Sequence, residues 1–258
     1  MTQKIIDFSK YSSIKIGQPE IVNIIETDED AKEEGFVIGG AYNLLVSQSP
    51  KKLLMLSSSY DYIKESNGMI FVGTATTGGK LMSYAKKNNL AGFEFLTYIP
   101  GTIGGMLAMN AGVKEYEIFG SLSAIRFTNG YKNNEEIKHE YRKAELPGIA
   151  LEAVFEKRFG YNEDLIEKLK KMRSNQPTEP SAGSAFKNPT GDYAGRLIEA
   201  VGLKGYKQNG MCFSEKHANF LINLGGGTFD SAMWLINEAK KRVFDKFGKK
   251  LELEIKIV

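Results

Sequence analysis

The chain has 258 residues, of which 42% are hydrophobic and 25% are charged, and it contains 27 glycines and 7 prolines. This composition is typical of a folded protein with a sizeable core, and it excludes a disordered or collagen-like chain. The formal net charge of +3 suits a small anionic ligand. The charge is too low to indicate nucleic-acid binding, and no run of five or six basic residues occurs.

Few residues are able to bind a metal or to form a disulfide. The single cysteine, Cys212, has no partner for an internal disulfide, and with only two histidines, His139 and His217, no zinc site is expected. We therefore expect a cytoplasmic protein without a metal. Residues 1–10 lack the apolar stretch of a signal peptide. Residues 95–113 are uncharged, but a proline and four glycines interrupt them, so no membrane span is expected.

The first 73 residues hold short apolar runs, which predict β-strands. The runs lie at residues 21–25, 35–38, 44–46, 53–56 and 69–72. Asn67-Gly68 stands before the last run, and because this pair accepts positive φ angles it predicts a hairpin with Tyr62-Ile63.

The middle of the chain predicts two helices and two strands. Apolar residues at helical spacing predict a helix over residues 79–88. A second helical piece follows the Pro100-Gly101 turn, and strands are expected at residues 122–127 and 149–155.

The pattern changes near residue 159, where we place a domain boundary. Asn162 is the predicted N-cap of a helix that stops before Pro177. Residues 177–192 are expected to form a long loop.

The last part of the chain alternates helices and strands. A helix is predicted over residues 193–201 and a strand over residues 220–224. A long amphipathic helix begins at Asp230 and ends at Gly248. Strict alternation over residues 251–257 predicts a half-buried strand.

Two glycine-rich segments are candidate anion sites. In Gly-Gly-Ala-Tyr-Asn at residues 39–43, successive backbone N–H groups can hold a phosphate, and the alternative is a tight turn. Residues 99–105 lead into a helix whose unpaired N–H groups attract anions, and the alternative is a buried crossing of two backbones. Neither segment has the spacing of a dinucleotide fingerprint.

Residues 180–189 place two serines, a lysine and an asparagine in one apolar segment. A hydroxyl held there can donate a proton, whereas the alternative is a serine-capped surface turn. No histidine is near in sequence, which argues against a serine nucleophile. By default Glu254 is expected on a solvated strand face and Arg142 at the surface, whereas His217 is either a ligand contact or a loop histidine. No single motif decides the function.

The order of seven motifs resembles the MurB family, the FAD-dependent UDP-N-acetylenolpyruvoylglucosamine reductases. The motifs are Gly39-Gly40-x-x-Asn43-Leu44, residues 99–105 through Asn110-Ala111-Gly112, Tyr141-Arg142, residues 180–189, Gly202-Leu203-Lys204-Gly205, residues 214–220, and Leu251-Glu252-x-Glu254. The short spacing between Arg142 and Ser184 is similar to the branch of the family that lacks an inserted loop carrying a tyrosine.

The resemblance implies an α+β fold. An FAD-binding domain of the vanillyl-alcohol-oxidase (PCMH) type would occupy residues 1–60 and 61–158 as two subdomains. A smaller α+β substrate-binding domain would occupy residues 159–258.

The resemblance also implies the site residues. Arg142 is the expected catalytic cation, Ser184 the proton donor, and Glu254 the group that polarises the substrate carboxylate. Asn188, Lys204 and His217 are expected to contact substrate. The expected FAD contacts are Gly39, Gly40, Ala41, Tyr42, Asn43, Leu44, Pro100, Gly101, Thr102, Gly104, Gly105, Asn110, Ala111 and Gly112.

The implied reaction belongs to peptidoglycan synthesis. NADPH reduces FAD, and the flavin N5 hydride then passes to the enolpyruvyl group of UDP-N-acetylglucosamine enolpyruvate, which yields UDP-N-acetylmuramate. The expected partner is this small substrate, with neither nucleic acid nor membrane, and the expected state is a monomer. The alternatives are an FAD oxidoreductase of the same fold with another substrate, and a non-catalytic flavin- or sugar-nucleotide-binding protein.

Overall fold

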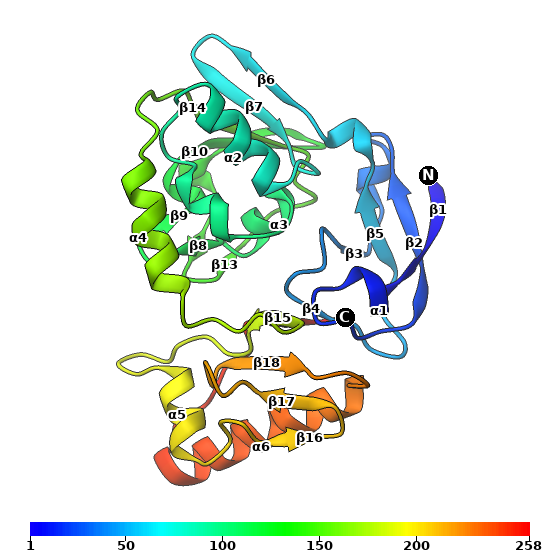
Figure 1. The fold of residues 1–258 in the computed structure, drawn as a ribbon. Coiled ribbons are helices and arrows are strands. Elements are labelled where there is room, and N and C mark those ends of the chain that lie inside the picture. The colour runs from blue at the N-terminus through cyan, green and yellow to red at the C-terminus, as the bar shows by residue number, and fades with distance from the viewer. The chain divides into compact units, whose positions relative to one another are not determined.

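The structure, a computed structural model, describes residues 1–258 and divides into two compact units (Figure 1). Unit 1 comprises Met1–Lys4, Val22–Gly40 and Lys52–Ser174, and unit 2 comprises Ile5–Ile21, Ala41–Lys51 and Asn175–Val258. The predicted domain limits at residues 60 and 158 stay predictions. The two units are defined by contacts between residues, whereas the predicted domains are defined by the ligand that each part binds.

Unit 1 contains a five-stranded antiparallel sheet with the strand order β11-β10-β14-β7-β6. Its strands are β6 (Ile63–Ser66), β7 (Met69–Gly73), β10 (Leu122–Phe127), β11 (Gly130–Asn133) and β14 (Glu152–Glu156). Asn67 and Gly68, between β6 and β7, have φ angles of 49° and 75°, so the predicted hairpin turn is confirmed.

Helices pack on this sheet through small and aliphatic side chains. Leu81 and Ala85 of α2 (Gly78–Lys87) share one core with Ile70 and Val72 of β7. The helix α4 (Glu163–Arg173) contacts the 3₁₀ turn η3 (Glu94–Tyr98). The short helix α3 (Ile103–Ala108) follows η3 in the chain. The side chain of Asn162 accepts the N–H of Leu165 at 3.1 Å, which confirms the predicted N-cap of α4.

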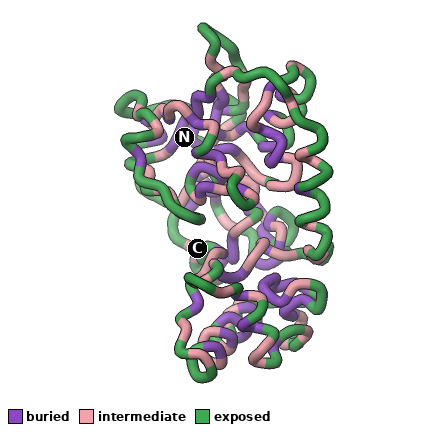
Figure 2. The backbone as a smooth tube through the Cα atoms, turned by 90° about the vertical axis from the view of Figure 1, so that its left-hand side faces the viewer, coloured by how far each residue is buried: buried purple, intermediate pink, exposed green.

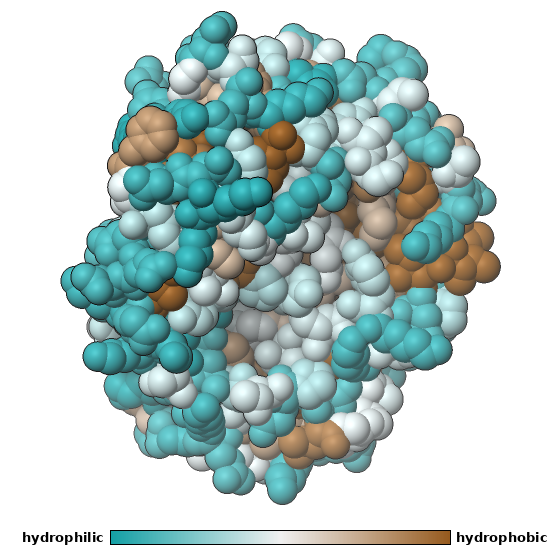
Figure 3. All heavy atoms as spheres, turned by 45° about the horizontal axis from the view of Figure 1, so that its top comes forward, coloured by the Kyte–Doolittle hydropathy of each residue, from teal (hydrophilic) through white to brown (hydrophobic).

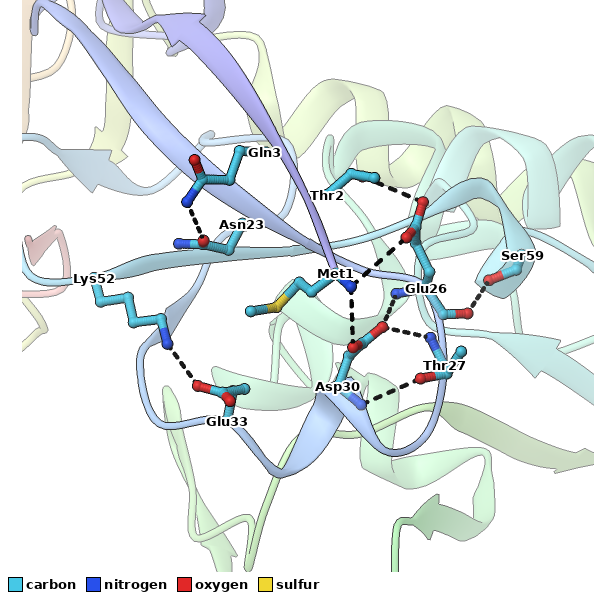
Figure 4. A network of polar contacts seen from close by, with 10 residues as sticks. All are labelled: Met1, Thr2, Gln3, Asn23, Glu26, Thr27, Asp30, Glu33, Lys52 and Ser59. Carbon is cyan, nitrogen blue, oxygen red and sulfur yellow. Dashed lines mark hydrogen bonds and ion pairs between the residues drawn. The ribbon is translucent and has the colours of Figure 1, made fainter.

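A second sheet has the strand order β1-β2-β5-β3. Its strands are β1 (Thr2–Asp7), β2 (Pro19–Ile25), β5 (Leu53–Leu56) and β3 (Phe36–Val37), and β5 pairs in parallel with both β2 and β3. Asp30 closes the turn after β2, because its carboxylate accepts the N–H groups of Glu26 and Thr27 at 3.0 Å each (Figure 4).

Unit 2 is built on a four-stranded antiparallel sheet with a long helix against one face. The sheet has the order β15-β18-β17-β16, from Ser181–Ser184, Phe220–Asn223, Met211–Phe213 and Lys207–Gln208. The helix α6 (Phe229–Phe247) packs on β16, β17 and α5 (Ala194–Ala200), and Leu235, Ile236 and Ala239 are fully buried there. Thr228 and Ser231 cap its start and Gly248 ends it, close to the prediction.

The remaining elements are short. They are the helix α1 (Phe8–Tyr11), the strands β4 (Leu44–Leu45), β8 (Gly112–Val113), β9 (Tyr116–Glu117), β12 (His139–Glu140), β13 (Lys143–Ala144) and β19 (Lys256–Ile257), and the 3₁₀ turns η1 (Asp30–Lys32), η2 (Ser58–Tyr60), η4 (Ile118–Gly120) and η5 (Asn134–Glu136).

Two expectations about the last hundred residues were wrong. The predicted loop at 177–192 contains β15, because Ser181 and Ser184 pair with Ile222 and Phe220 of β18. The predicted strand over residues 251–257 is regular only at Lys256–Ile257.

The final segment exchanges partners partway along its length. Leu253 forms an antiparallel bridge with Phe186, whereas β19 pairs in parallel with β4. The exchange breaks the alternation of exposure, since Ile255 is 2% exposed and Ile257 is 37% exposed. A single strand pairing would have buried both side chains equally.

Burial follows the elements. Buried backbone runs along the sheets and the inner faces of the helices, and the turns between them are exposed (Figure 2). The face drawn in Figure 3 is mainly hydrophilic, and hydrophobic residues appear on it in separate groups. None of the helices combines the length and the apolar character that crossing a membrane requires.

The change of partners at the chain end is testable by mutation. Ile255→Ala should lower the free energy of unfolding by about 2–5 kcal/mol, because it opens a cavity in the core. Ile257→Ala should cost less than about 1 kcal/mol, because the side chain is partly exposed already. Urea unfolding of both variants provides the measurement. Equal losses of unfolding free energy would instead support a continuous half-buried strand.

Candidate active site

The turn at residues 39–43 presents a row of unused backbone donors. The N–H groups of Gly40, Ala41 and Tyr42 donate to no group of the chain. The turn is fixed from its other side, since Ser13 donates its N–H to Ala41 O at 3.2 Å and its hydroxyl to Tyr42 O at 3.2 Å. Ala41 has a φ of 51°, and successive N–H groups around a left-handed residue form a concave nest that suits an anion.

Gly39 is required by the close approach of Thr102 within unit 1. A Cβ at position 39 would lie 2.4 Å from Thr102 Oγ1, which accepts the N–H of Gly105 at 3.3 Å and caps α3. The N–H groups of Ile103 and Gly104 also donate within the chain, to Thr76 O and Thr74 O at 2.9 Å.

The first N–H groups of α3 are therefore not unpaired, contrary to the sequence interpretation of residues 99–105. Open donors in these two motifs are the N–H groups of the nest at Gly40–Tyr42 and, just before α3, those of Gly101 and Thr102. Whether Pro100 to Gly105 contact the cofactor stays a prediction.

Arg142 is held on the hairpin between β12 and β13. It is the second residue of a two-residue turn, and its φ of 58° lies in the left-handed region, which is costly for a residue other than glycine. Its side chain is only 16% exposed. The guanidinium donates to Gly112 O at 2.7 Å and to Asn110 O at 3.4 Å, and it lies 3.8 Å from a carboxylate oxygen of Glu117.

Asn110 lies beneath this arginine and is 1% exposed. Its Nδ2 donates to Glu117 Oε2 at 2.7 Å and to Glu140 O at 3.3 Å. Its Oδ1 is buried and has no hydrogen-bond partner. Because buried polar atoms are almost always paired, this oxygen is suited to accept a donor from a bound group. Each of these features by itself suits a polar group of a cofactor such as FAD, the nest an anion and the Asn110 oxygen a hydrogen-bond donor.

A β-bulge determines which way Ser184 points. Ser181 pairs with Ile222 and Ser184 with Phe220, so β15 has one residue more than β18 over this stretch. Gly183, with a φ of 76°, provides the extra residue. In a regular strand Ser184 would share the face of Ala182, which is fully buried in the core with α6. The bulge moves Ser184 to the opposite face, beside Phe220.

The C-terminal motif meets two other motifs inside unit 2. The N–H of Glu254 donates to Ala185 O, and the Glu254 carbonyl accepts from Asn43 Nδ2, each at 3.0 Å. Glu254 is only partly exposed, whereas Glu252 and Lys256 beside it are exposed. The default assignment of Glu254 to a solvated face therefore does not describe its position.

The predicted substrate contacts gather around α5. Asn188 Oδ1 accepts the N–H of Ala194 at 3.0 Å at the start of this helix, and Lys204 pairs with Glu199 at 2.9 Å near its end. The ring of His217 packs against Gly195, where a Cβ would lie 3.4 Å from Cε1.

His217 is held as a neutral donor. Burial lowers the pKa of its imidazole, and the positive charge of Lys204 lowers that pKa further. Nδ1 accepts the N–H of Asn219 at 3.3 Å, so the proton of the neutral ring is on Nε2. A neutral ring with a fixed tautomer can donate a hydrogen bond to a ligand at neutral pH.

Sequence reasoning missed several residues that shape these sites. Ser13, Thr74 and Thr76 fix the glycine-rich segments from distant parts of the chain, and Glu117 contacts Arg142. None of them belongs to a motif from which we predicted a site residue. The bulge at Gly183 had a signal, namely a glycine inside a serine-rich segment that pairs as a strand.

A match to a family of known ligand places the chain among FAD-binding proteins. Residues 18–126 match a family described as "FAD binding domain", and residues 176–258 match "UDP-N-acetylenolpyruvoylglucosamine reductase, C-terminal domain".

Relatives over the full length define the family. The chain is 48% identical to the UDP-N-acetylenolpyruvoylglucosamine reductase of Helicobacter hepaticus over 100% of both chains. It is 44% identical to that of Campylobacter jejuni over 98% of this chain and 100% of the relative. The crystal structure of UDP-N-acetylenolpyruvylglucosamine reductase (MurB) from Thermus caldophilus superposes with a TM-score of 0.87 at 30% identity, covering 100% of this chain and 99% of the other. The chain belongs to the UDP-N-acetylenolpyruvoylglucosamine reductase family, and the predicted family and α+β FAD-binding fold are confirmed.

The role of the bulge is testable with two matched glycines. Gly183 and Gly191 both have left-handed φ angles, and a Cβ at either would meet no atom within 4 Å. Alanine at either position should cost about 1–2 kcal/mol of stability from the backbone alone. Only Gly183→Ala should also speed hydrogen exchange of the β15 and β18 amides. Unchanged exchange in that variant would argue against control of the strand register by the bulge.

The buried imidazole predicts a pH dependence of stability. Because the folded pKa of His217 lies below its ordinary 6.5, the unfolded chain binds the proton more readily, and stability falls as the pH drops through and below 6.5. His217→Gln should remove the part of this loss of stability that comes from protonation of the imidazole. Urea midpoints at pH 7.5 and 5.5 should therefore differ more for the wild type than for the variant, and equal differences would contradict the argument.

Proposed function

We infer that this chain is a UDP-N-acetylenolpyruvoylglucosamine reductase of peptidoglycan synthesis. It reduces the enolpyruvyl group of UDP-N-acetylglucosamine enolpyruvate to give UDP-N-acetylmuramate, with FAD bound and NADPH as the reductant. One observation carries the inference: relatives at 42–48% identity match the entire chain, including the C-terminal part that distinguishes this reductase from other FAD-binding proteins.

We also propose the setting of the enzyme. The lone, buried Cys212 is consistent with a reducing compartment, which supports the cytoplasm. A monomer is the simplest state, because this one chain supplies every proposed catalytic residue.

FAD, when bound, passes the reducing electrons from NADPH to the substrate. We propose that the N–H groups of Gly40, Ala41 and Tyr42 hold an FAD phosphate, and that Asn110 Oδ1 accepts a hydrogen bond from the cofactor. The other proposed contacts are Gly39, Asn43, Leu44, Pro100, Gly101, Thr102, Gly104, Gly105, Ala111 and Gly112.

Arg142 is the proposed stabiliser of developing charge. Reduction adds a hydrogen to each carbon of the enolpyruvyl double bond, and negative charge develops at the carbon beside the carboxylate before that carbon is protonated. A guanidinium keeps its charge at any physiological pH. Its low exposure supports the role, because a fixed cation in a site with little water acts more strongly than one in bulk solvent.

Ser184 is the proposed proton donor to that carbon. The bulge supports this role because it turns the hydroxyl away from the core of unit 2. Glu254 is proposed to polarise the substrate carboxylate. Its backbone pairs with Ala185, the residue after Ser184, so the two groups lie on neighbouring segments. Asn188, Lys204 and His217 are the proposed contacts to the rest of the substrate.

The activity is tested by an anaerobic flavin spectrum. NADPH should bleach the flavin absorbance of the purified protein, and UDP-N-acetylglucosamine enolpyruvate should restore it. Bleaching without recovery would favour an FAD oxidoreductase with another substrate. Bound FAD that NADPH does not bleach would favour a non-catalytic binding protein.

The same experiment tests the proton donor. Ser184→Ala should slow recovery of the flavin absorbance by about 10²- to 10⁴-fold, the usual contribution of a general acid, and should leave bleaching by NADPH nearly unchanged. Ser181→Ala is the matched control, because Ser181 lies on the same face of β15. Equal rates in the two variants would remove Ser184 from the mechanism.

A further inference from the structure

Glu117 reaches Arg142 because a glycine lies opposite it. Gly112 of β8 pairs with Glu117 of β9. A Cβ at position 112 would lie 2.3 Å from Tyr116 O and 2.7 Å from both Cα and Cγ of Glu117. The missing side chain therefore leaves the space that the Glu117 side chain occupies on its way across this hairpin.

The carboxylate of Glu117 connects two residues of the site. One oxygen accepts Asn110 Nδ2 at 2.7 Å, and the other lies 3.8 Å from Arg142 Nη1. Asn110 is 1% exposed, so the group that fixes the carboxylate is itself fixed by packing. A carboxylate held in this way has a defined position relative to the guanidinium.

Arg142 needs such support. Its backbone is in the left-handed region, and a residue other than glycine persists there only when surrounding contacts hold it. The carbonyls of Asn110 and Gly112 accept hydrogen bonds from the guanidinium, but both are neutral. Glu117 adds a negative charge to these contacts, 3.8 Å from Nη1.

We propose that Glu117 is a positioning residue for Arg142, an inference that rests on the proposed function. It orients the guanidinium toward the charge that develops on the substrate, and it does not touch the reacting atoms. The reduction of the flavin by NADPH develops no negative charge on a substrate carbon. The role of Glu117 toward Arg142 therefore belongs to the second half-reaction, whereas any effect through Asn110 would appear in the content of bound FAD.

The test uses Glu117→Gln in anaerobic single turnovers. At saturating UDP-N-acetylglucosamine enolpyruvate, recovery of the flavin absorbance should slow by about tenfold or more. In FAD-saturated protein, bleaching by NADPH should proceed at the wild-type rate, which a general loss of structure would not allow. Glu115→Gln is the matched control, because Glu115 lies in the same hairpin and is exposed; it should recover at the wild-type rate.

A double mutant identifies the route of the effect. If Glu117 acts through Arg142, adding Glu117→Gln to Arg142→Ala should slow recovery no further. Additive losses, or a wild-type rate in the single variant, would overturn the proposal while leaving the proposed function intact. Absence of recovery in the wild type would overturn both. If Glu117→Gln does not fold, Glu117→Asp keeps the charge and should show a smaller loss in the second half-reaction only.

Discussion

The exchange of backbone partners at the end of the chain is the constraint on which the rest of unit 2 depends. Residues 252–254 pair with residues 185–187, and residues 256–258 then pair with residues 43–47. The final segment thereby connects the turn at residues 39–43, the strand β15 and Glu254 to one another through backbone bonds. Backbone bonds, together with the hydrogen bond from Asn43 Nδ2 to the Glu254 carbonyl, set three motifs far apart in sequence at fixed spacing.

Left-handed backbone occurs at three residues of the proposed site. Ala41, Asn110 and Arg142 have φ angles of 51°, 40° and 58°, and none of them is glycine. Such conformations cost about 1 kcal/mol or more each and persist only where tertiary contacts hold them. Each has such contacts, from Ser13, from Glu117 and from the carbonyls of the 110–112 segment. At these three positions tertiary contacts offset the local cost of the backbone conformation.

The sequence predicted regular elements well and irregular ones badly. Strands such as 53–56 and the capped helix after Asn162 follow from local periodicity and capping, which the structure keeps. The strand at Ser181–Ser184 was missed because its pairing with β18 is a long-range property. Resemblance pointed to Arg142, but no local pattern predicted its hairpin or Glu117. The unpaired donors expected at α3 were already used by Thr74 and Thr76, whose position no motif encodes.

The polar groups left over in the cofactor segments have a consequence for the protein without its flavin. Three turn N–H groups and the buried oxygen of Asn110 lack partners within the chain. A ligand that satisfies them binds the native state and not the unfolded chain, so it shifts the folding equilibrium by mass action. Bound FAD would therefore stabilise the folded protein, and a shortage of flavin would lower the fraction of the chain that is folded.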